Sequence, residues 1–250
     1  FALDWYTRNN YDLIGLIRTT GAGGQIEKLA NVASMKSHGV EFTLSTKNIQ
    51  TKDFSWTTDF IFSYSKTKVT DLQTNSKVID LVSGTGFALE GYPVRGLFSY
   101  KFNGLSDKGY PVITDQNGNV TSSGEDIDFQ SQTLDNLVYE GPSDPTTTGS
   151  FGNIFKYKNF RLNVFITYSF GNVVRLDPVF KEKYTDLTAM PKEFKNRFVQ
   201  AGDENITDIP VILTNAQVTR DNYLKTLYNA YNYSTARVAK GDFIRMKEIS

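Results

Sequence analysis

Residues 160–170 constrain the fold of this chain more than any other segment. Their odd positions are polar apart from Phe165. Their even positions form one apolar series, which reads Phe160, Leu162, Val164, Ile166, Tyr168 and Phe170. A period of two over this length predicts a β-strand with one apolar and one polar face. The run is also as long as a tilted strand that crosses a membrane, about 9–11 residues.

The residues before this strand predict a β-hairpin. A two-residue loop at Lys158-Asn159 would pair Tyr157 with Phe160. The same register sets three further pairs on one face: Phe155 with Leu162, Asn153 with Val164, and Phe151 with Ile166. The apolar face then continues over both strands, as a fixed register requires. Lys-Asn is not the Asn-Gly pair that such loops favour, so the turn type stays open.

Alternation recurs elsewhere in the chain. One face of residues 54–64 reads Phe54, Trp56, Thr58, Phe60, Phe62 and Tyr64. Shorter alternating runs occur at residues 40–45 and 1–6, and residues 236–250 are strand-like without clear alternation. We therefore expect strands near residues 1–8, 35–47, 54–68, 147–157, 160–170 and 236–250.

The expected strands are joined by connections of two alternating sizes. Those at residues 48–53 and 158–159 are short, whereas those at 9–34, 69–146 and 171–235 are long. Soluble domains seldom carry several structureless loops of that length. Outer-membrane barrels do, with short turns on one side of the membrane and long loops on the other.

The long connections contain patterns of their own. Residues 94–102 alternate, but a further spanning strand there would break the long–short order, so we expect a strand inside a loop. Residues 221–232 predict a short helix with Asp221 as its N-cap. A second helical stretch is expected around residues 179–200, interrupted near Pro191. The apolar face of the first helix, at helical spacing, consists of Leu224, Leu227, Tyr228 and Tyr231.

Two explanations compete for the apolar strand faces. One is a soluble sandwich or barrel that buries them in a core, and the other is a membrane barrel that turns them toward lipid. Aromatic rings stand at the ends of the runs with aliphatic side chains between them, most clearly at residues 160–170. This order is typical of the two aromatic girdles of membrane barrels. The predicted fold class is therefore all-β, a portion of an antiparallel transmembrane β-barrel with short periplasmic turns and long extracellular loops.

This fold assigns residues to the two faces of the sheet. The expected lipid-facing residues are Phe54, Trp56, Phe60, Phe62, Phe160, Leu162, Val164, Ile166, Tyr168 and Phe170. An arginine on the lipid face near the membrane midplane costs about 2–4 kcal/mol, so charged residues belong to the lumen. The expected lumen-facing residues are Glu41, Asp59, Arg161 and Asn163.

Composition excludes several classes of function. The chain has 27 basic and 27 acidic side chains and no net charge, so it lacks the basic surface that nucleic acid requires. The absence of Cys excludes a disulfide framework, a thiolate metal site and a cysteine nucleophile. The single histidine, His38, is not accompanied by a Gly-x-Ser-x-Gly motif. We expect no catalytic residue, no metal and no cofactor.

Aromatic residues in the long connections are the candidates for contact with a substrate or partner. They are Tyr92, Phe98, Tyr100, Tyr110, Tyr228 and Tyr231. Aromatic faces stack on sugar rings and anchor protein partners. The alternative for each of these rings is packing of the loops against the barrel rim.

Short stretches spread over nearly the whole chain carry a family resemblance. They include Asp4-Trp5-Tyr6-Thr7-Arg8, His38-Gly39-Val40-Glu41-Phe42, Phe54-Ser55-Trp56-Thr57-Thr58-Asp59, Gly91-Tyr92-Pro93, Gly109-Tyr110-Pro111 and Gly241-Asp242-Phe243-Ile244-Arg245-Met246-Lys247. In these stretches the chain resembles the SusC/RagA-like TonB-dependent outer-membrane transporters of Bacteroidetes.

The resemblance implies that residues 1–250 are part of a barrel of about 22 strands in the Gram-negative outer membrane. The signal peptide, the plug domain and the final strands are expected outside this sequence. The implied function is TonB-dependent import of oligosaccharides, of the starch or glycan utilisation type, or of oligopeptides. The implied partners are a SusD-like surface lipoprotein, the lipid bilayer and, through the missing N-terminal region, the TonB complex. A siderophore or cobalamin receptor, or a secreted β-rich carbohydrate-binding module, is the alternative.

Overall fold

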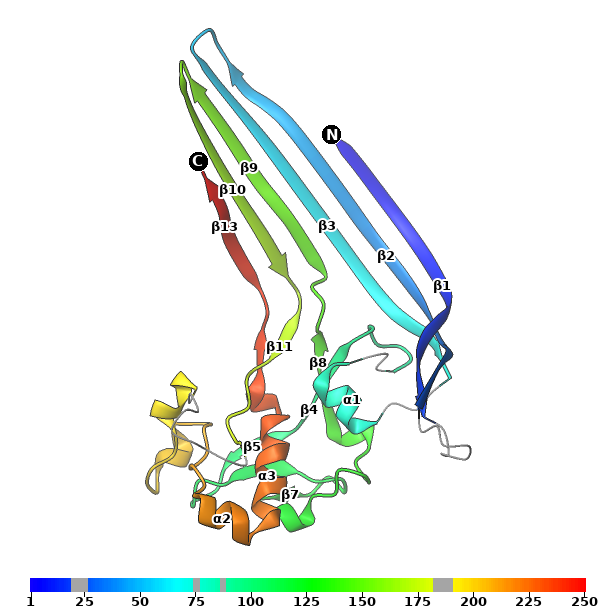
Figure 1. The fold of residues 1–250 in the computed structure, drawn as a ribbon, viewed down its shortest axis with the longest axis vertical. Helices are drawn as coiled ribbons and strands as arrows, with labels where there is room; N and C mark the ends of the chain where they lie inside the picture. The colour runs from blue at the N-terminus through cyan, green and yellow to red at the C-terminus, as the bar shows by residue number, and fades with distance from the viewer. Residues whose placement is uncertain (19–26, 74–76, 86–88, 182–190) are drawn as a thin grey trace.

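A six-stranded antiparallel sheet dominates the structure (Figure 1), a computed structural model that describes residues 1–18, 27–73, 77–85, 89–181 and 191–250. Its strands follow in the order β1-β2-β3-β9-β10-β13. Their bounds are β1 Ala2–Arg18, β2 Glu27–Gln50, β3 Phe54–Leu72, β9 Thr147–Tyr157, β10 Phe160–Phe170 and β13 Phe243–Ile249. Every neighbouring pair is antiparallel, which confirms the all-β, antiparallel architecture of the predicted fold class. Within the described residues the sheet does not close, because β1 and β13 are its two edges.

The predicted long connection at residues 9–34 is wrong. β1 and β2 continue through it as paired strands as far as Arg18 and Glu27, and the residues that remain between them lie outside the described part. The cause is a bulge between Asn10 and Leu13, where Asp12 adopts a φ of 55°. A bulge inserts one unpaired residue and so interrupts the alternation that reveals a strand.

A bulge also explains the weak alternation near the end of the chain. Phe165 pairs with Glu248 and Ile166 pairs with Met246, so Lys247 is the extra residue. The extra residue restores Ile249 to the face that carries Ile244 and Met246. The expected strand at residues 236–250 is in fact two, since residues 238–240 belong to a separate pair in the loops.

The hairpin of β9 and β10 has the register that the sequence predicts. Tyr157 pairs with Phe160, Phe155 with Leu162, Asn153 with Val164 and Phe151 with Ile166. In the loop, Lys158 has a φ of 51° whereas Asn159 does not have a positive φ. A positive φ at the first central residue alone is the pattern of a type II′ turn.

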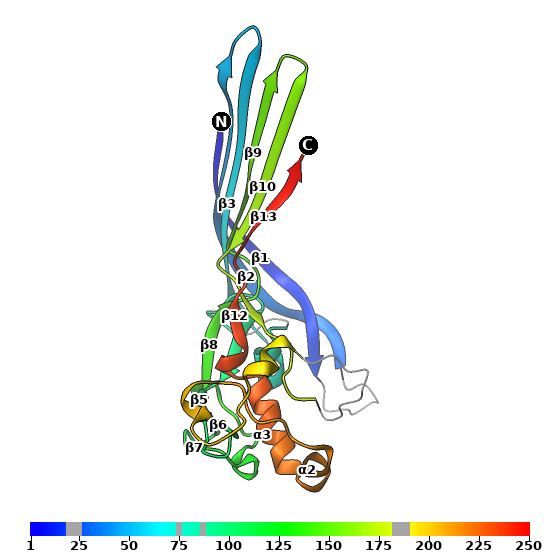
Figure 2. The same cartoon turned by 90° about the vertical axis from the view of Figure 1, so that its left-hand side faces the viewer.

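The two other long connections fold together into one body, which we call the cap. The cap comprises the described parts of residues 73–146 and 171–242 and lies at the end of the sheet opposite the short turns (Figures 1 and 2). Its elements are α1 Val78–Ser83, β4 Gly96–Tyr100, β5 Phe102–Leu105, β6 Pro111–Thr114, β7 Val120–Thr121, β8 Leu137–Pro142, β11 Val173–Arg175, α2 Asn215–Arg220, α3 Asn222–Asn232 and β12 Val238–Lys240. Within the described ranges, no helix is both long and apolar enough to cross a membrane.

The patterns predicted inside the long connections have mixed outcomes. β4 pairs with β8 outside the large sheet, which confirms the loop strand at residues 94–102. α3 is the predicted helix, and the Asp221 side chain accepts hydrogen bonds from the backbone N–H groups of Tyr223 and Leu224. The helix expected around residues 179–200 is reduced to one 3₁₀ turn at Lys192–Asn196 after Pro191, and residues 182–190 lie outside the described part.

The cap has a hydrophobic core of its own, built from both connections. Phe98 and Ile113 come from the first connection, and Leu227 and Tyr228 from the second. All four are at most 2% exposed. The cap is thus held together by burial of apolar surface between segments more than 100 residues apart in the sequence.

Arg175 links the two connections through hydrogen bonds. Its guanidinium donates to the carbonyl of Ser234 at 2.8 Å, and to those of Val82 and Phe98 at 2.9 and 2.7 Å. Burial lowers the pKa of Arg175 to about 10, with nearby Glu140 opposing that shift. The group therefore remains charged at neutral pH while it satisfies three backbone carbonyls.

Gly149 lets an aromatic ring cross the sheet. A Cβ added to Gly149 would clash with the carbonyl oxygen of Ile61 and with the hydroxyl oxygen of Tyr168. The Tyr168 hydroxyl donates to that same Ile61 carbonyl at 3.0 Å. The ring of Tyr168 thus covers the glycine and bonds to a strand two places away, in the manner of aromatic rescue.

We predict that Gly149→Ala lowers the free energy of unfolding by about 1–3 kcal/mol, because the new methyl group overpacks the sheet. Gly152→Ala is the matched control in the same strand, since its Cβ would meet no atom nearer than 3.3 Å. Denaturant titration of the purified protein measures both. Equal losses for the two variants would contradict the close approach at Gly149.

We predict that Arg175→Leu weakens the cap without disturbing the sheet. The loss of hydrogen bonds from a charged donor lowers the opening free energy of the cap by about 3 kcal/mol, as measured by native-state hydrogen exchange. Arg95→Leu is the control, because Arg95 pairs with Asp144 at 2.8 Å with both side chains more than half exposed. That exposed pair contributes less than about 1 kcal/mol. An unchanged exchange pattern in Arg175→Leu would contradict the linking role.

Candidate functional site

The pairing registers give the large sheet two chemically different faces. Residues directly opposite each other in antiparallel strands lie on the same face. One continuous row across five strands consists of Leu44, Phe60, Phe151, Ile166 and Met246. The neighbouring row, on the opposite face, includes Ser45, Asp59 and Gly152. The sheet is therefore apolar on one side and largely polar on the other.

The ten residues expected to face lipid all lie on the apolar face. The register of β3, β9 and β10 places the even-numbered residues of β3 and β10 on one side, from Phe54 opposite Tyr157 to Ile166 opposite Phe151. None of the described elements packs over this face (Figures 1 and 2), and Phe160 at its tip is 79% exposed and Trp5 on the edge strand 75%. An exposed apolar surface of this extent marks a site of interaction.

The four residues expected to face a lumen all lie on the polar face, spread along the length of the strands. Glu41 pairs with Ser63, and Asp59 pairs with Ser45, whose hydroxyl donates to the Asp59 carboxylate at 2.6 Å. Asn163 donates to the carboxylate of Glu248 on β13 at 2.9 Å. The fourth, Arg161, is exposed. The structure places these four residues on one face of the sheet. That this face meets a lumen and the other meets lipid stays a prediction.

Aromatic residues mark both ends of the apolar face. The tip row, next to the short turns, is formed by Phe54, Tyr157 and Phe160. The cap-side row consists of Trp5, Val40, Tyr64, Thr147 and Phe170. From Phe54 to Tyr64 the strand advances about 33 Å at the usual rise of about 3.3 Å per residue. At the tilt of about 40° found in membrane barrels, that length spans about 25 Å, the height of their apolar band.

Charged residues begin where this apolar band ends. After Tyr64 the same face of β3 continues with Lys66 and Lys68. Their partners on β2 are His38 and Lys36. The apolar band on this face therefore ends at Tyr64 on the cap side, while β2 and β3 continue past it toward the cap, where Val32 and Val69 are buried.

One polar side chain inside the band has its carbonyl oxygen hydrogen-bonded twice. The side-chain oxygen of Asn153 accepts hydrogen bonds from the indole N–H of Trp56 and from the hydroxyl of Thr58, both at 2.8 Å. Asn153 is only 8% exposed. A polar group in an apolar environment costs little once it is hydrogen-bonded in this way.

The loop aromatics chosen from the sequence are mostly core residues of the cap. Phe98, Tyr100, Tyr228 and Tyr231 are each at most 3% exposed. Tyr110 is partly buried against the same core. Tyr92 lies nearer the surface, with its ring centroid 5.1 Å from that of Phe98. Most of these rings therefore pack within the loops.

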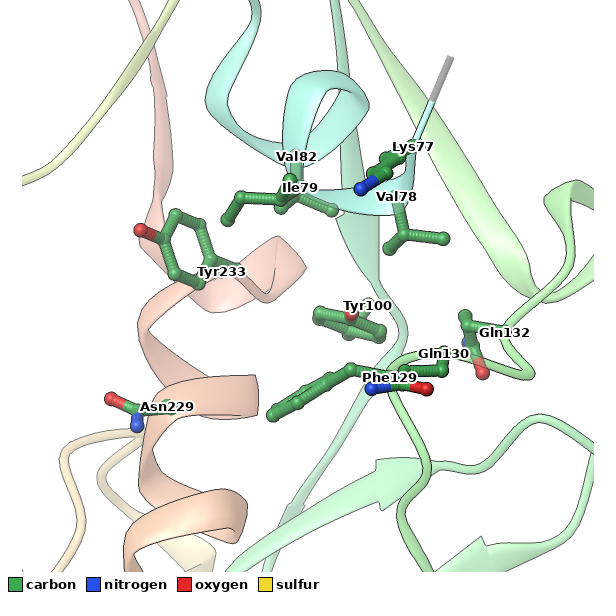
Figure 3. Close-up of a pocket in the computed structure, with 10 residues that line it drawn as sticks. All are labelled: Lys77, Val78, Ile79, Val82, Tyr100, Phe129, Gln130, Gln132, Asn229 and Tyr233. Atoms are coloured by element: carbon green, nitrogen blue, oxygen red, sulfur yellow. The ribbon is translucent and has the colours of Figure 1, made fainter. Parts of the chain in front are cut away.

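The cap also contains a half-open pocket of about 950 Å³ (Figure 3). Of the six aromatics chosen from the sequence, only Tyr100 lines it. Sequence reasoning missed its other walls, which come from α1, from the loop at residues 129–132 and from α3. No periodic signal marks them, because the pocket exists only through the packing of the two connections. Within the described ranges, no cluster of His, Cys, Asp and Glu side chains is arranged to hold a metal ion.

The known proteins of similar sequence reported below are all named TonB-dependent receptors. No family model matches the chain. It is 30% identical to TonB-dependent receptor P3 of Formosa agariphila, over 69% of this chain and 19% of the relative. It is 25% identical to TonB-dependent receptor P39 of the same organism, over 99% of this chain and 27% of the relative. It is 24% identical to TonB-dependent receptor SusC of Bacteroides thetaiotaomicron, over 70% of this chain and 18% of the relative.

Solved structures match the chain over nearly its full length. The structure of the RagAB peptide transporter superposes with a TM-score of 0.70 at 21% identity, covering 99% of this chain and 26% of that one. The RagAB peptide importer in its closed-closed state gives 0.69, with the same identity and coverage. The chain spans about a fifth to a quarter of the length of the curated relatives it matches. The resemblance inferred from the sequence is thereby confirmed: this chain is similar, in sequence and in fold, to part of the SusC/RagA-like TonB-dependent receptors.

Proposed function

We propose that this chain is part of an outer-membrane β-barrel that imports nutrients in a TonB-dependent manner. The observation that carries the proposal is the apolar band. It is limited by aromatic rows at both ends and is followed by lysines on the cap side. Its height of about 25 Å fits the hydrocarbon layer that membrane barrels span. The named relatives are TonB-dependent receptors, which supports the mode of energy supply.

In this proposal the apolar face meets lipid and the polar face lines the lumen. Backbone groups at the edges β1 and β13 need partners, because an unpaired edge in hydrocarbon costs several kcal/mol for each group. Strands outside this chain supply those partners. The chain covers only part of the length of its relatives, and this supports a barrel completed by other segments of a longer receptor.

The proposed orientation places the short turns in the periplasm and the cap outside the cell. A SusD-like surface lipoprotein then meets the cap, and TonB acts through a region outside these residues. The cargo we propose is an oligosaccharide or an oligopeptide; the matched RagAB structures are those of a peptide transporter. The protein's role is passage of the cargo, with no chemical step on it.

We predict that Val164→Arg blocks assembly into the outer membrane. Val164 lies on the apolar face opposite Asn153 and Ile249, where an arginine costs about 2–4 kcal/mol. Asn163→Arg is the matched control, since it places the same side chain one residue away on the polar face beside Glu248. Membrane fractionation and heat-modifiable mobility measure assembly. Equal assembly of the two variants would refute the assignment of the faces.

We predict that cells lacking the gene for this receptor lose uptake of its labelled oligosaccharide or oligopeptide cargo. Collapse of the inner-membrane proton gradient, or removal of TonB, produces the same loss in cells that retain the receptor. Uptake is measured by accumulation of the label. Accumulation that persists without TonB and without the gradient would contradict active import.

A further inference from the structure

The pocket in the cap has walls that suit an apolar side chain. Val78, Ile79 and Val82 of α1 form one side of it (Figure 3). Tyr100 and Phe129 form another, with ring centroids 5.6 Å apart. Aliphatic and aromatic walls release water when an apolar group enters, which is the usual basis of binding in such pockets.

The pocket also carries an unsatisfied hydrogen-bond donor. Gln132 lines it and is only 8% exposed, yet its side-chain nitrogen is buried without a hydrogen-bond partner. Leaving a buried donor unpaired costs about 1–3 kcal/mol, and native structures contain few such groups. Less than 1 Å² of this nitrogen is accessible, so a ligand carbonyl oxygen in the pocket satisfies it once the Gln132 amide turns toward the cavity. Gln130 and Asn229 add two further amides, which both donate and accept.

The charge of the lining selects the sign of the ligand. Lys77 is the one charged residue among those that line the pocket, and its amine is directed over the cavity (Figure 3). The described lining contains no carboxylate. The Asp80 carboxylate accepts a hydrogen bond from the backbone N–H of Lys77 at 3.1 Å but does not line the pocket. The Lys77 ammonium is therefore the only charge among the described lining residues, and it favours an anionic group on the ligand.

These features together describe a peptide end. We propose that the pocket binds the carboxyl-terminal end of a peptide, with an apolar side chain against α1, a backbone carbonyl on Gln132 and the terminal carboxylate near Lys77. This proposal rests on the proposed import function and names one class of cargo for it. A sugar is the competing ligand, because rings such as Tyr100 and Phe129 can stack on its face, and the competition with maltoheptaose described below decides between the two.

The test is a binding measurement on the intact receptor, purified in detergent. The probe is the peptide Gly-Gly-Leu-Leu with fluorescein on its amino end, followed by fluorescence anisotropy. We expect saturable binding that weakens about fivefold when the peptide carboxylate is amidated and, separately, when Lys77 is changed to Gln. Lys108→Gln is the matched control, since Lys108 is exposed in the cap and does not line the pocket.

Two further variants separate binding from folding. Ile79 is 49% exposed, so Ile79→Glu leaves the fold intact while it places a carboxylate against the apolar side chain and abolishes binding. Gln132→Leu removes the unpaired donor, so it leaves thermal stability equal or higher while it weakens binding. A structural glutamine would instead lower stability on substitution and leave affinity unchanged.

The possible results test the peptide pocket separately from the proposed import function. Wild-type affinity in Lys77→Gln, Ile79→Glu and Gln132→Leu would overturn the pocket, and so would displacement of the probe by maltoheptaose. Either result leaves outer-membrane assembly, tested by Val164→Arg, untouched. Conversely, a receptor that binds the peptide but is absent from the outer membrane would contradict the import function alone.

Discussion

The structure depends on an apolar sheet face that none of the described elements covers. In a soluble sheet such a face is buried against another layer, and its burial supplies the main stabilising free energy. Here the row through Phe60, Phe151 and Ile166 crosses the sheet with no element packed over it. Backbone hydrogen bonds hold the strands in register, and the apolar face contacts the surrounding medium. The proposed hydrocarbon layer is a medium in which these apolar side chains are exposed without a free-energy penalty.

The cap follows a different principle from the sheet. Its core is built from the two long connections, and the guanidinium of Arg175 joins carbonyls from both of them. Neither connection could bury these residues alone. The pocket also depends on both connections, because α1 and Gln132 come from the first connection and Asn229 from the second. Any movement of one connection relative to the other therefore changes the shape of the pocket and its proposed affinity for the carboxyl-terminal end of a peptide.

The sequence predicts those parts of the structure that local periodicity determines. The register of β9 against β10 followed from alternation and a two-residue loop at Lys158-Asn159, and α3 followed from the spacing of Leu224, Leu227 and Tyr231 after Asp221. The bulges near Asp12 and at Lys247 broke that periodicity, so the length of β1 and the face of β13 were missed. The pocket could not be predicted, because its walls meet only through tertiary packing. The loop aromatics were visible in the sequence, but nothing local distinguishes a core ring such as Tyr228 from a ligand-binding one.

Depth-resolved quenching tests the central claim most directly. This chain contains no Cys, so Val164→Cys and Asn163→Cys each introduce one labelling site, on opposite faces of the same strand. A fluorophore attached at each site is read in lipid vesicles that contain the intact receptor. The account predicts that nitroxides on the lipid chains quench the label at position 164, and that a water-soluble quencher reaches the label at position 163. Quenching of both labels from water, or of neither from lipid, would contradict it.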